Sequence, residues 1–137
     1  MMNARVFQEI MDSEGLKMSK SVLIMLKEAK QCQKNIKRMM VYQHLPRIAE
    51  YIEKQKELKD KAIWEAIMVA HLEKKYGFRL IEDRNEAIIA TFQISDPQNE
   101  VAKEIRRHIE IMTELEKEYE KLKNGMDKIL KRGENDE

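Results

Sequence analysis

The chain of 137 residues has few of the residues that make tight turns, with only four glycines and two prolines. β-Sandwiches, barrels and glycine-rich phosphate loops depend on such residues, so the composition argues against all three. There is also only one cysteine, Cys32, which excludes an intramolecular disulfide and a zinc site built from cysteines. Cys32 falls within a helical pattern, and we expect it to be a small buried hydrophobic residue.

Long apolar runs are missing as well. No stretch reaches the roughly 18 apolar residues of a membrane-spanning helix, and residues 1–5 do not resemble a signal peptide. We therefore expect a cytoplasmic protein that has no membrane partner. With 42% hydrophobic and 37% charged residues, the chain has the composition of a folded domain. Its length predicts one domain over residues 1–132, followed by a disordered tail at 133–137.

Signatures of catalysis and metal binding are absent from the sequence. It contains no Gly-x-Ser-x-Gly, no phosphate-binding or dinucleotide-binding glycine motif and no Glu-x-x-His pair. The nearest approach to a metal site is Glu104 with His108 at helical spacing. His108 belongs to an otherwise apolar stripe, which favours a hydrogen-bonded core or interface histidine. We expect no enzymatic activity, no cofactor and no bound metal.

The first half of the chain has apolar residues at the spacing of three helices. A short helix is predicted over residues 4–12, with Gly15 as its stop. Ser19 or Ser21 would cap a second helix that runs to about His44. The expected core stripe of this second helix is Val22, Leu26, Ala29, Gln33, Ile36 and Met40, widened by Met25, Cys32 and Met39.

Pro46 is suited to the first position of a third helix that runs to Tyr76, with Gly77 ending it. Residues 53–61 contain one strongly apolar side chain, Leu58, so this helix has a weak point in its middle. Asp83 and Glu86 have the spacing of a capping box and introduce residues 84–94. That segment is either a short helix, which we prefer, or a strand paired with residues 78–82.

The final helix begins at Ser95-Asp96-Pro97, where cap residues precede a proline. Gly125 predicts fraying or a kink beyond Lys123. Apolar residues in this helix repeat every 3.5 positions, which is typical of a bundle seam. The seam consists of Val101, Ile105, His108, Met112, Leu115, Tyr119, Leu122, Met126 and Ile129. Together the segments predict an all-α fold, an antiparallel up-down four-helix bundle with an additional short helix.

Charge is balanced overall, at +1, but it is unevenly distributed along the chain. Residues 17–61 hold twelve basic and five acidic residues, whereas 82–120 hold five basic and eleven acidic ones. A basic strip on the second helix comprises Lys27, Lys30, Lys34, Lys37 and Arg38. Such a strip either contacts the phosphates of a nucleic acid or faces the acidic final helix, within the chain or across a dimer, or is simply solvated. We prefer the explanations without nucleic acid.

Residues 62–72 are apolar on two sides of the predicted helix, and Trp64, Met68 and Leu72 make up the second stripe. Either this helix is central in the monomer, a short helix (4–12 or 84–94) covers the stripe, or a partner does. We expect a second copy of the chain, with Trp64 as its anchor. The predicted function is a non-enzymatic bundle that mediates protein–protein interaction as a homodimer. The alternative is a nucleic-acid-binding accessory protein that uses the basic strip.

The length, the helical composition rich in Lys, Glu, Ile and Met, and the lack of enzyme motifs together suggest one resemblance. The chain resembles small all-α proteins encoded by spindle-shaped viruses of hyperthermophilic archaea. The resemblance implies a four-helix bundle that acts through protein contacts, with host or viral proteins as further partners in the host cytoplasm. It transfers no functional residue to this chain.

Overall fold

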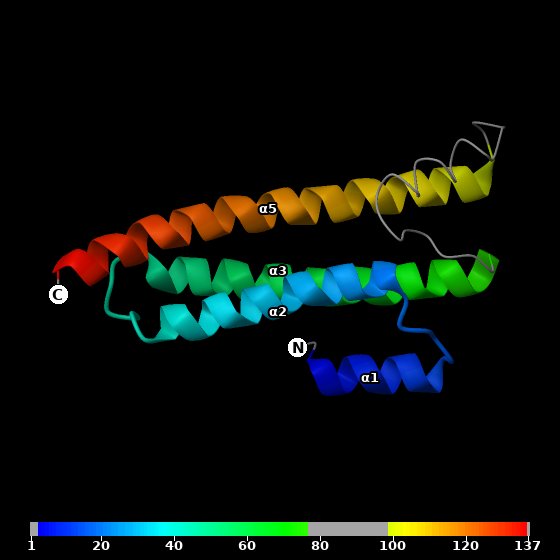
Figure 1. The fold of residues 1–137 in the computed structure, drawn as a ribbon, viewed down its shortest axis with the longest axis horizontal. Helices are drawn as coiled ribbons and strands as arrows, with labels where there is room; N and C mark the ends of the chain where they lie inside the picture. Colours follow the sequence, from blue (N-terminus) through cyan, green and yellow to red (C-terminus); the bar gives the residue numbers. More distant parts are fainter. Residues whose placement is uncertain (1–2, 77–98, 137) are drawn as a thin grey trace.

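A computed structural model describes residues 3–76 and 99–136, with side chains as far as Arg132. Several predictions lie outside these residues: the stop at Gly77, the helix or strand over 84–94, and the start at 95–97. Four helices are described: α1 (Ala4–Ser13), α2 (Lys20–Met40), α3 (Ile48–Tyr76) and α5 (Glu100–Asp136). α2, α3 and α5 are long rods, with α3 antiparallel to both α2 and α5, and α1 is a shorter helix beside them (Figure 1). The predicted all-α four-helix bundle is confirmed.

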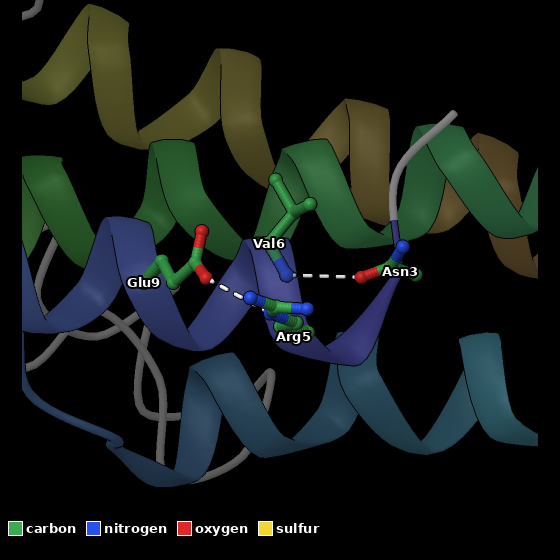
Figure 2. A network of polar contacts seen from close by, with 4 residues as sticks. All are labelled: Asn3, Arg5, Val6 and Glu9. Atoms are coloured by element: carbon green, nitrogen blue, oxygen red, sulfur yellow. Dashed lines mark hydrogen bonds and ion pairs between the residues drawn. The ribbon is translucent and has the colours of Figure 1, made fainter.

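Side-chain caps define where the helices begin. The Asn3 side chain accepts a hydrogen bond from the backbone N–H of Val6 at 2.9 Å, and an Arg5–Glu9 ion pair follows one turn on (Figure 2). Ser19 caps α2 by accepting from the N–H of Val22, which decides between the two serines proposed from the sequence. Each cap satisfies a backbone donor that has no partner within its helix.

The turn between α2 and α3 departs from the prediction. α2 ends at Met40, four residues before His44, and α3 begins at Ile48 rather than at Pro46. The N–H groups of Tyr42 and Leu45 donate to carbonyls three residues back, which makes tight turns instead of α-helix. Arg47 completes the reversal with a φ of 70°, in the left-handed region that glycine normally occupies.

Neither of the two predicted weak points ends its helix, because tertiary packing outweighs local propensity. α3 continues through residues 53–61, where Leu58 is fully buried. α5 continues through Gly125 and on to Asp136, past the predicted domain end at residue 132. Leu130 is buried in the core, which anchors this end of α5. The polar residues that follow do not by themselves end a helix.

The core stripe of α2 is shifted from the predicted one. Met40 is 51% exposed, and Leu26 and Gln33 are only half-buried. The buried apolar residues are Val22, Met25, Ala29, Cys32, Ile36 and Met39, at alternating spacings of three and four. The seam of α5 agrees better with the prediction, since Ile105, His108, Met112, Leu115, Leu122 and Met126 are all buried.

α3 is the central helix and contacts α1, α2 and α5 (Figure 1). This position explains why residues 62–72 are apolar over most of the helix circumference. The core consists of two clusters, a larger one that includes Leu58 and a smaller one that includes Ile48 and Ile52. Gln55, which is fully buried, falls between them along α3.

Gly125 of α5 lies against the ring of Tyr51 in α3. A Cβ atom at Gly125 would lie 2.7 Å from Cε1 and 2.8 Å from Cζ of Tyr51. We expect Gly125→Ala to lower the free energy of unfolding by about 1–3 kcal/mol, as overpacking does. In a Tyr51→Ala background the same change should raise it by about 1 kcal/mol, because alanine favours helix over glycine. Urea unfolding of the four proteins measures both effects, and the same sign in both backgrounds would refute the contact.

Candidate interaction surfaces

Two of the three residues of the predicted second stripe are exposed, and the third is buried. Trp64 is 52% exposed and Met68 is 49% exposed, so both lie on the surface of the chain. Leu72 is buried and belongs to the core, which corrects its assignment to the contact surface. At 3.6 residues per turn, Leu72 is rotated about 80° from Trp64 around the helix axis, far enough to leave the surface.

One quadrant of α3 remains uncovered by the other described helices, and we call it the open face of α3. Its exposed residues are Glu57, Lys61, Trp64, Met68, His71 and Lys75, again at alternating spacings of four and three. Spacing of this kind keeps residues on one face over several turns. The open face therefore has two apolar side chains in its centre and charged or ionisable side chains at both ends.

Polar contacts join both edges of the open face to neighbouring helices. On one side, His71 Nε2 lies 2.5 Å from Glu14 Oε2, and Lys74 donates to the Glu14 carbonyl. On the other side, Lys75 pairs with Glu104 of α5 at 3.5 Å. α1 packs beside the face, where Phe7 and Met11 are buried, and leaves Trp64 half-exposed. The proposed cover by residues 4–12 is therefore wrong, and cover by 84–94 lies outside the described residues.

The basic strip is a continuous exposed ridge on the outer side of α2. Arg38 pairs with Asp127 of α5 at 3.2 Å. Within residues 3–76 and 99–132, the four lysines of the strip (Lys27, Lys30, Lys34 and Lys37) have no ion-pair partner. Among these side chains, Arg38 is thus the one residue of the strip that pairs with the acidic final helix.

His108 is a hydrogen-bonded core histidine, one of the two roles expected for it. Its Nδ1 lies 2.5 Å from Oε1 of Glu65 in α3, and both side chains are buried. Glu104, which together with His108 was the nearest approach to a metal site in the sequence, pairs with Lys75 instead. Among the described residues there is no group of three metal-ligating side chains. Sequence reasoning missed Glu65, although it is the one acidic residue in the apolar run 62–72.

Cys32 is buried in the core, as predicted from its place in the helical pattern. Burial, with a smaller contribution from nearby Glu28, raises the pKa of its thiol to about 12. The thiolate is the nucleophilic form of cysteine, so the group is unreactive at neutral pH.

Comparison with known proteins identifies no relative. No protein-family model, no curated protein and no solved structure matches the chain. The resemblance to proteins of archaeal viruses remains a prediction. None of the described helices is long and apolar enough to cross a membrane.

Proposed function

We propose that this protein is a non-enzymatic helical bundle that mediates protein–protein interaction, and that it pairs with a second copy of itself through the open face of α3. The observation that supports this is the half exposure of Trp64 and Met68 in the middle of the central helix. Large aromatic side chains flanked by polar residues are typical anchors of protein interfaces.

Covering the two apolar residues contributes a useful but limited free energy. A tryptophan side chain buries roughly 200 Å², so covering its exposed half contributes about 2.5 kcal/mol at 25 cal/mol per Å². Each copy supplies one such residue and one methionine. Because association also costs entropy, polar pairs at the ends of the interface must add to the apolar centre.

The charges of the open face suit an antiparallel pairing of two copies. If a two-fold axis passes between Trp64 and Met68, then Trp64 faces the partner's Met68. Glu57 then faces the partner's Lys75, and Lys61 faces the partner's His71, beside which lies the partner's Glu14. Such a face is complementary to itself, as a two-fold interface requires. Opposite charges at both ends favour this register over a parallel one.

Light scattering tests the proposal. The native chain should have twice its 16.3 kDa mass at high concentration, and Trp64→Glu should reduce it to a monomer. Leu23→Glu is the matched control, since Leu23 is similarly exposed, at 47%, but lies on α2. Glu57→Lys should weaken the dimer by placing two lysines together. A native chain that stays monomeric, or a dimer that persists in Trp64→Glu, would contradict the proposal.

A second candidate function is nucleic-acid binding by the basic strip, which the four unpaired lysines favour. Neutralising four phosphates implies a slope of about −3.6 in log affinity against log salt for duplex DNA. Gel shifts with duplex and single-stranded DNA at low and moderate salt measure this dependence. Lys30→Gln with Lys34→Gln should weaken binding, whereas Lys121→Gln with Lys123→Gln on α5 should have little effect. Absence of a shift at low salt would eliminate this candidate.

A further inference from the structure

A pocket of about 520 Å³ lies at the end of the bundle where the α2–α3 turn meets the last turns of α5. Its lining residues come from the turn, from the first part of α3 and from α5. Figure 1 shows the α2–α3 turn beside the C-terminal part of α5. The lining residues are Leu45, Pro46, Arg47, Tyr51, Gly125, Lys128, Ile129 and Arg132.

Of the described residues that line the pocket, three are cations and none is acidic. Lys128 and Arg132 are four residues apart in α5, which places them on one side of that helix. Neither has an ion-pair partner among the described side chains. Arg47 reaches Glu50 only at 4.0 Å, while Glu50 is held by Lys54 at 2.8 Å. Lys54 lowers the pKa of Glu50 by hydrogen bonding and by its charge. The described lining of the pocket therefore has an excess of positive charge.

The backbone at Arg47 supports a role for this residue beyond making the turn. Its φ of 70° is unfavourable for any residue with a Cβ, and glycine would satisfy the turn without strain. The chain instead places a guanidinium group here, beside the Tyr51 ring at 5.9 Å from its centroid. A guanidinium group binds phosphate oxygens in a two-pronged geometry that lysine lacks.

The other lining residues suit an organic group. Leu45, Pro46 and Ile129 provide apolar surface, and Tyr51 provides an aromatic ring and a hydroxyl group. The volume falls within the usual range for small-molecule sites and exceeds what a bare anion needs. We propose that this pocket binds a small organic phosphate, with its phosphate on Arg47, Lys128 and Arg132 and its organic part against the apolar wall.

The site is independent of the proposed dimer. Arg47 lies 17 residues from Trp64, about 25 Å along α3. Substitutions at Lys128 and Arg132 are therefore expected to leave the mass in solution unchanged. A chain that self-associates but binds no phosphate would contradict the pocket proposal alone. A chain that binds phosphate but stays monomeric would contradict the dimer proposal alone.

Calorimetric titration of the full chain at low ionic strength tests the site, with inorganic phosphate and phenyl phosphate as the two probes. Both should bind with one site per chain, and phenyl phosphate about fivefold more tightly, since it alone contacts the apolar wall. Lys128→Gln with Arg132→Gln should weaken both at least about tenfold, because charge-assisted hydrogen bonds are lost. Lys121→Gln with Lys123→Gln removes the same charge from exposed positions of α5 and should change affinity less than twofold.

Arg47→Gly separates binding from folding. It should raise the midpoint of thermal unfolding by relieving the positive φ, and should weaken phosphate binding at the same time. No heat with either probe would overturn the proposal, and so would equal losses in the two double variants, which would indicate only a general effect of net charge. Equal affinities for inorganic phosphate and phenyl phosphate would contradict the proposal that an organic part of the ligand contacts the apolar wall.

Discussion

Replacing His108 by alanine is expected to destabilise the bundle by about 3–5 kcal/mol. The side chains of His108 and Glu65 are only 11% and 7% exposed, and their contact links α5 to α3. Removing the imidazole leaves the Glu65 carboxyl group buried without its hydrogen-bond partner and opens a cavity beside it. Both consequences are costly in a dry core.

The surface pair between His71 and Glu14 provides a matched control, because it joins the same two residue types. These side chains are 44% and 45% exposed, so water can replace the lost partner. In the Trp64→Glu background, where no second copy covers the open face of α3, His71→Ala should cost less than about 1 kcal/mol. Replacing both buried residues by leucine should come close to native stability, since no unpaired polar group remains. Urea unfolding of these variants checks the series; similar costs for His108→Ala and His71→Ala would contradict it.

The opposite effect is expected at Gln55, where substitution should stabilise the protein. Gln55 is fully buried, and neither its Oε1 nor its Nε2 has a hydrogen-bond partner in the described structure. A buried amide without partners costs about 1–3 kcal/mol. Gln55→Met keeps a similar shape and removes both polar atoms, so we expect the free energy of unfolding to rise by about that amount.

Gln33 in α2 is the control for this prediction. It is half-buried, and its Oε1 accepts a hydrogen bond from Lys59 Nζ at 2.8 Å. Gln33→Met loses that bond and should bring no gain in stability. A shift of the urea midpoint at an unchanged m-value, the slope of unfolding free energy against urea concentration, would show that the free energy of unfolding has changed. A lower midpoint for Gln55→Met than for the native chain would be inconsistent with an unsatisfied amide.

The sequence predicted helices well where one apolar stripe had no competitor. In α5 the 3.5-residue repeat selected the seam, and most of it is buried. In α2 two overlapping stripes were available, and periodicity alone did not separate Leu26 and Met40 from Met25 and Met39. Packing against α3 selects the second pair. Only the neighbouring helices determine which apolar side chains are enclosed.

The candidate sites were predicted in part, and the missing parts come from contacts between distant segments. The exposed side chains of Trp64 and Met68 were visible in the sequence as an extra apolar stripe. Leu72 was assigned to the same stripe because a four-residue step rotates only about 40° around the helix axis, but two such steps carry it into the core. The partner of His108 is 43 residues away, at Glu65. The pocket combines Arg47 with Arg132 across the antiparallel arrangement of α3 and α5. No local pattern indicates that such residues meet.

The break in the core at Gln55 divides the bundle into regions with different local stability. The smaller cluster, which includes Ile48 and Leu130, lies at the end that holds the pocket. That end contains fewer buried apolar residues, so it should open by itself more often than the whole chain unfolds. A ligand in the pocket would then slow amide hydrogen exchange around the α2–α3 turn, while the helices beside Trp64 keep their own exchange rates.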